Sequence, residues 1–262
     1  MEPRRPDAGY SLAELLVATA LVGLLMGAVF GVYEISQRQY GIASAGEEAL
    51  LFARTALERI ASDLRMAGAG WTRSDGIFLA ASSTTISFLG DINGDTLDSR
   101  ERDATLDADA PLGATTVRVS SGEGFSKGDF LQIADGAIQE NRLITAVAGR
   151  SLTLAAGLST HYPAGSSVRS VETVTYSLDT GGILRRTVGG SRAQPFANRV
   201  QSFTLTYWDG SDPPVPLIPA SQADRDRIRQ ITVKLTVLVP SGGSSVARTI
   251  ESSVRPRNLL EK

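Results

Sequence analysis

The chain has 262 residues, of which 42 % are hydrophobic and 21 % are charged, so it is long enough for one large domain or two small ones and is not disordered as a whole. Its net charge of −2 argues against a general nucleic-acid-binding protein. The absence of cysteine excludes disulfides and cysteine nucleophiles. The single histidine, His161, leaves little room for a histidine-based metal or catalytic site, and we interpret it as a turn residue.

Residues 15–33 form an apolar run that contains no charge and in which Thr19 is the only clearly polar residue. As a helix this run would be about 28 Å long at about 1.5 Å per residue, which matches the hydrocarbon core of a bilayer. An Ala-x-Ala cleavage site does not follow the run. We therefore expect a single membrane-spanning helix that is retained rather than removed as an ordinary secretory signal.

Two features mark this helix as more than a plain anchor. Glu14 lies directly before the apolar run, where an ionised carboxylate is costly in lipid and is a functional candidate. Its other interpretation is local, because Ser11 and Glu14 fit the S-x-x-E capping box of a helix start. Gly23, Gly27 and Gly31 lie four apart, a spacing that lets membrane helices pack closely, although glycine is also common in membrane helices generally.

Residues 9–18 read Gly-Tyr-Ser-Leu-Ala-Glu-Leu-Leu-Val-Ala. This stretch resembles the processing motif of type IV prepilins and type II secretion pseudopilins, with Tyr10, Ser11 and Ala13 in place of the usual phenylalanine, threonine and isoleucine. The resemblance implies that residues 1–9 are a leader peptide, that a prepilin peptidase cuts between Gly9 and Tyr10, and that the new amine of Tyr10 is methylated. It also implies a single-pass inner-membrane protein with a periplasmic body that later joins a pilus at the cell surface.

Under this resemblance Glu14 has a role in assembly. In a filament of packed helices, the Glu14 carboxylate of one subunit would neutralise the Tyr10 amine of its neighbour and set the axial register, because a paired charge is cheaper in a low-dielectric core than two lone ones. The expected partners are the prepilin peptidase, other minor and major pilins, the pilus assembly platform and the membrane.

Beyond the membrane run, apolar residues recur at intervals of mostly three and four and predict one helical stripe. The stripe consists of Ile42, Ala45, Ala49, Phe52, Ala53, Ala56, Leu57, Ile60, Ala61 and Leu64. Charged residues, Asp63 among them, are expected on the other faces, and the glycines at 68 and 70 end the helix. We therefore expect one helix over residues 10–66 that crosses the membrane at about 15–33 and whose later half is covered by the rest of the chain.

From residue 71 the chain has the pattern of strands and turns. Strands are predicted at residues 84–89, 115–120, 130–134, 142–147, 151–155, 171–178, 183–188, 200–208, 228–239 and 245–254. We expect a β region with an acidic loop at 67–107, a small inserted β module with Gly-rich turns at 108–170, and a C-terminal antiparallel sheet at 171–262. The predicted fold is therefore α+β, with a long helix packed on an antiparallel sheet.

The acidic loop at residues 91–102 places oxygen-bearing side chains at alternate positions, as Ca²⁺ loops do. The candidate ligands are Asp91, Asn93, Asp95, Leu97 through its carbonyl, Asp98 and Glu101. Thr96 replaces the usual turn glycine and Glu101 stands one position early, so the other interpretation is an Asn-Gly turn in a solvated acidic loop. Ca²⁺ is the one cofactor that the sequence suggests.

Catalysis is not expected, because the sequence lacks a G-x-S-x-G elbow, a phosphate-binding glycine loop and an H-E-x-x-H pair. The basic excess of residues 171–262 is spread along strands without interleaved aromatics, which favours a solvated face over a nucleic-acid groove. Trp71, Tyr207 and Trp208 are expected in the core, because aromatics near sheet edges are more often core residues, and the other interpretation is a recognition surface.

Residues 59–68 resemble the helix end of PilW-like minor pilins, and residues 252–258 resemble the closing strand of the same group and of the J-type minor pseudopilin. The sequence therefore favours a PilW-like minor pilin that primes assembly of a type IV pilus or stands near its tip. The alternatives are a J-type minor pseudopilin of type II secretion and, from another class, a signal-anchored Ca²⁺-dependent binding or adhesin domain that never polymerises.

Overall fold

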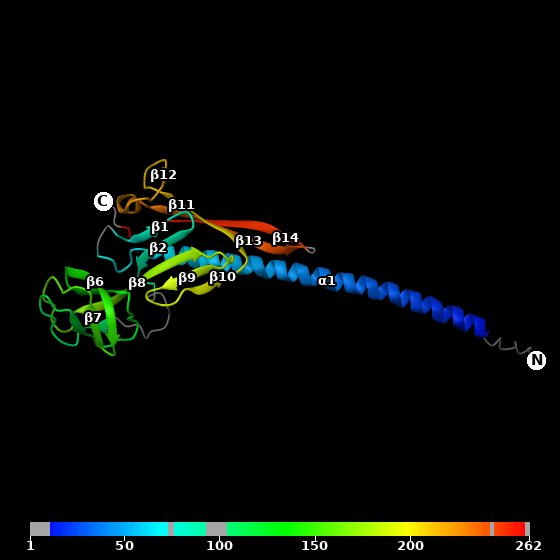
Figure 1. The fold of residues 1–262 in the computed structure, drawn as a ribbon, viewed down its shortest axis with the longest axis horizontal. Coiled ribbons are helices and arrows are strands. Elements are labelled where there is room, and N and C mark those ends of the chain that lie inside the picture. The colour runs from blue at the N-terminus through cyan, green and yellow to red at the C-terminus, as the bar shows by residue number, and fades with distance from the viewer. Residues whose placement is uncertain (1–10, 73–75, 93–103, 242–243, 260–262) are drawn as a thin grey trace, which may run out of the picture. The chain divides into compact units, whose positions relative to one another are not determined.

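A computed structural model gives the fold of the chain and describes residues 11–72, 76–92, 104–241 and 244–259. The fold is α+β with antiparallel sheets, as the sequence predicted (Figure 1). The chain divides into two compact units, Met1–Glu48 with Val239–Val246 and Ala49–Leu238 with Ala247–Lys262. Each unit is described by itself.

The helices are α1 (Leu12–Arg65) and the short α2 (Gln222–Arg225). The strands are β1 (Phe78–Ala81), β2 (Thr85–Gly90), β3 (Ala104–Thr105), β4 (Thr116–Arg118), β5 (Phe130–Asp135), β6 (Ile138–Ala148), β7 (Ser151–Leu154), β8 (Ser167–Leu178), β9 (Leu184–Val188), β10 (Gln194–Ala197), β11 (Val200–Trp208), β12 (Pro216–Leu217), β13 (Gln230–Ser241) and β14 (Ser244–Val254).

Helix α1 is continuous over 54 residues, because no proline interrupts it and residues that favour helix predominate. It ends where the backbone turns left-handed, at Gly68 with φ 83° and Gly70 with φ 70°. The Gly68 N–H then donates to the Leu89 carbonyl at 2.8 Å. A Cβ at Gly68 would lie 2.9 Å from the Asn258 carbonyl oxygen, so both the backbone angle and the space favour glycine.

In the first unit, α1 packs against a short part of the β13–β14 hairpin. Gly46 is buried, and a Cβ built on it would lie 3.1 Å from Cγ1 of Val239. The absence of a side chain at residue 46 therefore lets the helix backbone approach this strand closely.

The second unit contains two antiparallel sheets. The larger has ten strands in the order β1-β2-β8-β5-β6-β7-β4, with β3 and β9 also pairing with β8 and β10 pairing with β9. The smaller has the order β12-β11-β13-β14. Strand β8 is the central element of the larger sheet, because its 12 residues pair with β2, β3, β5 and β9.

The later half of α1 contributes one face to the core of the second unit. Its buried residues are Ala53, Ala56, Leu57, Ile60, Ala61 and Leu64. Two predictions about this stripe are wrong. Phe52 is 65 % exposed, because it lies about 100° around the helix from Ala53 and so outside the covered face. Asp63 is 3 % exposed, because it lies three residues after Ile60 and shares its face.

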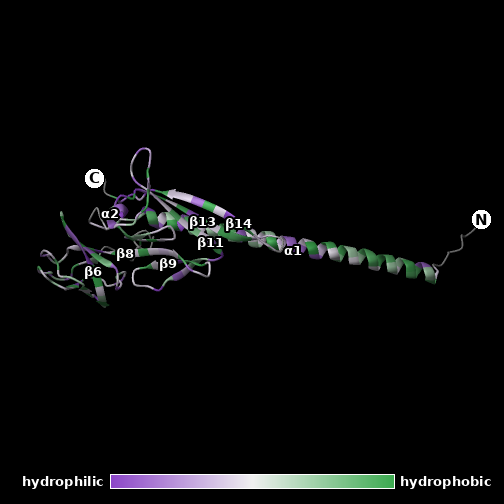
Figure 2. Ribbon diagram, turned by 45° about the horizontal axis from the view of Figure 1, so that its top comes forward, coloured by the Kyte–Doolittle hydropathy of each residue, from purple (hydrophilic) through white to green (hydrophobic). Residues whose placement is uncertain are grey.

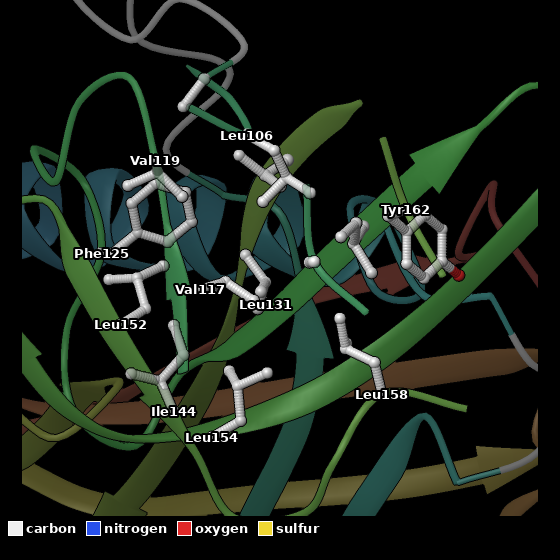
Figure 3. Close-up of a cluster of buried hydrophobic side chains, with 14 residues drawn as sticks. Leu106, Val117, Val119, Phe125, Leu131, Ile144, Leu152, Leu154, Leu158 and Tyr162 are labelled. Carbon is white, nitrogen blue, oxygen red and sulfur yellow. The ribbon is translucent and has the colours of Figure 1, made fainter. Parts of the chain in front are cut away.

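The strands between residues 104 and 168 have a hydrophobic cluster of their own (Figure 3). Figure 3 shows Val117, Val119, Phe125, Leu131 and Leu152 gathered on one side of this cluster, with Tyr162 beyond them. Every prominent strand expected from the sequence is present. The sequence missed β1, β3, β10, β12 and α2, which have two to four residues each.

Candidate functional site

The start of α1 carries the first candidate site. Ser11 and Glu14 form a reciprocal capping box, in which Ser11 N–H donates to Oε2 of Glu14 at 3.1 Å and Glu14 N–H donates to Oγ of Ser11 at 3.2 Å. Both residues are exposed. Gly9 and Tyr10, the expected cleavage and methylation residues, lie outside the described residues. The local interpretation of Glu14 is therefore present in the single chain, and its carboxylate remains accessible at the helix start.

The following apolar segment of α1 is uncovered on every side. The most hydrophobic stretch of the helix has mean hydropathy 2.4, is long enough to cross a membrane and has none of its length buried. Figure 2 shows this segment coloured almost continuously hydrophobic. Leu15, Leu24, Val29 and Phe30 are each at least 62 % exposed. Such a surface needs lipid or other apolar helices around it, because exposing it to water costs free energy in proportion to its area.

The glycines at 23, 27 and 31 lie within this uncovered segment. Apart from the neighbouring backbone of the helix itself, a Cβ built on any of the three would have no described atom of this chain within 4 Å. Packing within the single chain therefore gives no reason for glycine at these positions, in contrast to Gly46 and Gly68.

A buried ionic cluster joins the later half of α1 to β8 and β9. The Tyr176 hydroxyl donates to Oδ2 of Asp63 at 2.6 Å, and Arg186 Nε donates to the same oxygen at 2.9 Å. Arg59 Nε lies 2.9 Å from Asp63 Oδ1, one helical turn away. Burial, followed by the negative charge of Asp63 and the bond to it, raises the pKa of the Tyr176 phenol well above its usual range, so Tyr176 remains the donor.

This cluster fixes how α1 lies on the larger sheet. One carboxylate receives donors from two arginines and a tyrosine, which compensates the burial of its charge. The sequence analysis missed the cluster because it assigned Asp63 to the polar faces. The signal was available, since Asp63 stands at the spacing of the apolar stripe.

Two further carboxylates, those of Glu172 and Asp129, are buried and lie close enough for their charges to interact. Burial raises the pKa of Glu172 to about 7, partly opposed by the Ile92 N–H that donates to its Oε2 at 3.1 Å. Burial likewise raises the pKa of Asp129 to about 6, against the N–H of Ser126 at 2.9 Å. The negative charges of Asp129 and Asp91 add to the shift at Glu172.

The expected Ca²⁺ loop is described only at its beginning. Asp91 N–H donates to the Ala69 carbonyl at 3.0 Å, which attaches the start of the loop to the turn that follows α1. The remaining candidate ligands lie outside the described residues, namely Asn93, Asp95, Leu97, Asp98 and Glu101. Among the residues that the structure does describe, no group of three or more histidine and acidic side chains is placed to hold a metal ion.

Of the aromatic residues singled out in the sequence, Tyr207 lies in the core, whereas Trp71 and Trp208 are half-buried. Tyr207 is buried, and its hydroxyl donates to the Ser82 carbonyl at 2.7 Å. Trp71 is half-buried and packs edge-on against Phe130 with ring centres 5.1 Å apart. Trp208 is half-buried, and its indole N–H donates to Thr232 Oγ1 at 3.2 Å. The exposed His161 lies 3.9 Å from Asp109.

Comparison with known proteins gives one match. Residues 4–30 match the family described as the prokaryotic N-terminal methylation motif. No curated protein and no solved structure matches the chain significantly. The matched residues include the capping box, Gly23 and Gly27, and most of the uncovered apolar segment. Gly31 lies just beyond the match. The motif is that of type IV prepilin-like proteins and indicates a structural, membrane-anchored family whose members a prepilin peptidase processes and which assemble with other pilins. The chain thus carries a type IV prepilin-like methylation motif at its N-terminus, which supports its place among pilins and pseudopilins.

Proposed function

We propose that this chain is a PilW-like minor pilin that a prepilin peptidase cuts between Gly9 and Tyr10 and that then enters a type IV pilus. The observation that carries the proposal is the methylation motif at residues 4–30 followed by a helix whose apolar surface is uncovered all round. Before assembly the helix spans the inner membrane and the body is periplasmic. Assembly then moves the helix from lipid into a bundle of similar helices, which keeps its surface in an apolar environment.

The chemistry of the helix start supports this route. Cleavage before Tyr10 would leave a cationic amine on the residue that precedes Ser11, whose N–H donates to the exposed Glu14 carboxylate. In the bundle, Glu14 would pair with the amine of a neighbouring subunit, since either charge alone in an apolar core is costly. The pairing would set the axial register, and the assembly platform would add the subunit to other minor and major pilins.

We place the subunit at or near the pilus tip, where it would prime assembly. The support is the inserted strands of residues 104–168, which have a hydrophobic cluster separate from the face of α1. If every subunit along a filament carried such a module, the modules would crowd one another. A subunit present once, at the end of the filament, avoids this crowding.

Mass spectrometry of the N-terminal peptide, from cells with and without prepilin peptidase, tests the proposal. We expect a chain that begins with N-methylated Tyr10 only when the peptidase is present. A Gly9→Leu variant, whose side chain fills the position before the cut, should keep residues 1–9 even with the peptidase, whereas Gly23→Leu is the matched control and should be processed. A chain that keeps its leader in both strains would contradict the proposal and favour an anchored binding domain.

Crosslinking tests whether the chain assembles with subunits of a type IV pilus or with those of type II secretion. A photoreactive residue at Leu24, which is 72 % exposed in the single chain, would label whichever helix packs against it. Recovery of pilus subunits supports the minor pilin. Recovery of secretion pseudopilins would replace it with the J-type minor pseudopilin, which shares the same processing chemistry.

A further inference from the structure

Four arginines meet at one end of the smaller sheet, within the second unit. Strand β11 ends next to the point where β13 begins, because Trp208 pairs with Gln230 in the antiparallel register. Strand β14 ends at the same edge, since Thr232 contacts Ser253 there through their hydroxyls at 2.7 Å. The segments that extend beyond these strand ends surround a pocket of about 770 Å³.

Among the residues that the structure describes, the pocket is lined by Arg227, Arg229, Arg255 and Arg257 and by a single acidic residue, Asp209. The four arginines come from two separate segments of the sequence, residues 227–229 and 255–257. The sequence alone therefore shows no sign that they form one cluster. The antiparallel fold brings them together. If each arginine carries one positive charge and Asp209 one negative charge, the lining has a net charge of +3, obtained as four minus one.

The Asp209 carboxylate does not neutralise the four arginines as a group. Asp209 Oδ1 accepts bonds from Ser211 N–H at 3.1 Å and Val215 N–H at 3.0 Å, so it organises its own loop. Its other oxygen lies 3.2 Å from Arg227 Nη2. The bonds from Ser211 and Val215, more than Arg227, lower the pKa of Asp209 to about 2.

The side chains of Arg229 and Arg255 are held by neutral groups, which orient them without cancelling their charge. Arg229 Nη1 donates to the carbonyls of Asp226 at 2.7 Å and Ile228 at 2.9 Å. Arg255 Nε donates to Oε1 of Gln230 at 2.9 Å. The Arg257 backbone N–H donates to the Arg65 carbonyl at 3.1 Å, which fixes this segment to the end of α1. Within the described part of the chain, the exposed Arg257 guanidinium makes no hydrogen bond or ion pair.

Neighbouring acids do not fill the pocket. Asp224 receives the Ser221 N–H and hydroxyl in the capping box of α2. Asp226 accepts bonds from the Gly76 N–H at 2.9 Å and the Gln222 amide at 2.8 Å. Both carboxylates serve their own loops, and neither lines the pocket.

We propose that this pocket binds a ligand that carries several phosphate groups, as a nucleic-acid backbone or a free polyphosphate does. Guanidinium groups present planar pairs of donors that match phosphate oxygens, and four of them surround one concave space. The lining residues that the structure describes include no aromatic residue and few apolar ones, unlike the centre of a protein interface. The pocket therefore favours a phosphate chain over an acidic protein surface. Without aromatic side chains the described lining lacks the usual stacking platform for bases, so we expect nucleic acid to bind mainly through its backbone and without sequence preference.

The inference is independent of the filament, and the full-length protein in detergent micelles suffices to test it. The probe is a fluorescein-labelled single-stranded oligonucleotide of roughly 16 nucleotides, followed by fluorescence anisotropy. We expect binding that weakens with salt, a loss of about tenfold in affinity for Arg257→Gln, and a fall of about 0.7 in the slope of log affinity against log salt. Oligonucleotides of different sequence should bind equally.

Arg248→Gln is the matched control, because Arg248 is exposed on β14, carries the same charge and does not line the pocket. Its affinity should equal that of the unaltered protein. Arg255→Gln should lose affinity like Arg257→Gln, with an unchanged unfolding midpoint for both. Competition by inorganic polyphosphate as strong as that by unlabelled oligonucleotide of equal charge would identify phosphate groups alone as the ligand, and weaker competition would identify nucleic acid.

Three results would overturn the inference. Absence of binding of the labelled oligonucleotide at low salt removes it. An equal loss with Arg248→Gln shows that attraction comes from the general charge of the surface. Competition by poly-glutamate as strong as that by polyphosphate assigns the pocket to an acidic protein partner.

Discussion

The Tyr176 hydroxyl on β8 donates a hydrogen bond of 2.6 Å to the Asp63 carboxylate on α1, two groups 113 positions apart in the sequence. Replacing Asp63 by alanine should remove the shared acceptor of Tyr176 and Arg186, and leave the buried Tyr176 and the half-buried Arg186 without it. We expect the free energy of unfolding to fall by about 3–5 kcal/mol. Tyr176→Phe should cost less, about 1–2 kcal/mol, because Arg59 and Arg186 still compensate the carboxylate. Denaturant titration followed by the fluorescence of Trp71 and Trp208 measures both changes.

Asp107 provides a control with the same kind of partners. It lies 3.2 Å from Arg118 and 2.7 Å from Arg150, but its side chain is 32 % exposed. Asp107→Ala should therefore cost at most about 1 kcal/mol. If Asp63→Ala lowered the free energy of unfolding as little as Asp107→Ala does, the buried cluster would not hold α1 on the sheet.

A second prediction concerns pH. The pKa of Glu172 is raised from 4.5 to about 7 and that of Asp129 from 3.8 to about 6, mainly by burial. Between the unfolded and folded pKa values the folded protein retains protons that the unfolded chain has released. The free energy of unfolding should therefore decrease as pH rises from about 4 to about 7, by on the order of 2–3 kcal/mol for Glu172.

Glu172→Gln isolates the contribution of this residue. The amide oxygen can still accept the Ile92 N–H but has no charge to bury. We expect the variant to be more stable than the unaltered protein at pH 8 and similar to it at pH 4, measured by denaturant unfolding at each pH. The exposed Glu123→Gln is the matched control. If the free energy of unfolding of Glu172→Gln varied with pH in parallel with that of the unaltered protein, Glu172 would not be the source of the pH dependence.

The sequence predicted the elements whose patterns extend over many residues. The apolar run and the stripe that follows it predicted α1, and alternation over long segments predicted β8, β11, β13 and β14. Strands such as β10 and β12 were missed because two to four residues carry no periodicity, and pairing with β9 or β11 alone defines them.

The polar sites show where pattern reasoning ends. Binary patterning treats every carboxylate as a surface group, so it placed Asp63 in solvent, although three donors compensate its burial. The arginine pocket depends on which strand ends meet at one edge, and this follows from sheet order rather than from local sequence. In contrast, the motif at the N-terminus is local, and the comparison found it at residues 4–30.

The acidic loop yields a prediction from the sequence alone. If residues 91–102 bind Ca²⁺ in the folded protein only, the ion should raise the unfolding midpoint in proportion to the logarithm of its concentration. Thermal unfolding after EGTA treatment, with and without added Ca²⁺, measures this, and Mg²⁺ is the control ion. Identical midpoints would leave the solvated Asn-Gly turn as the interpretation of the loop.

Two substitutions at the start of α1 distinguish a local, helix-capping role of Glu14 from a role in assembly. Glu14→Gln keeps an oxygen that can accept the Ser11 N–H but removes the charge, whereas Ser11→Ala removes the cap at Glu14 N–H and keeps the charge. If Glu14 pairs with a neighbouring amine, Glu14→Gln should lower incorporation into pili by at least about tenfold, and Ser11→Ala should incorporate normally. Immunoblots of sheared pili, normalised to membrane-bound protein, measure incorporation. Normal incorporation of Glu14→Gln would eliminate the register role.

Gly27 tests whether the glycine spacing serves packing between subunits. Apart from the neighbouring backbone of the helix itself, no described atom of this chain lies within 4 Å of a Cβ at residue 27, so Gly27→Leu should leave the free energy of unfolding of the body unchanged. Leucine is also more apolar than glycine, so insertion into the membrane should persist. A neighbouring helix that approaches the glycines closely would nevertheless meet the new side chain, and incorporation into pili should fall. Ala28→Leu is the matched control, because residue 28 lies about 100° around the helix from residue 27. If both variants are incorporated like the unaltered chain, the three glycines reflect only the composition of membrane helices, and if both fail equally, the added volume matters and the glycine face does not.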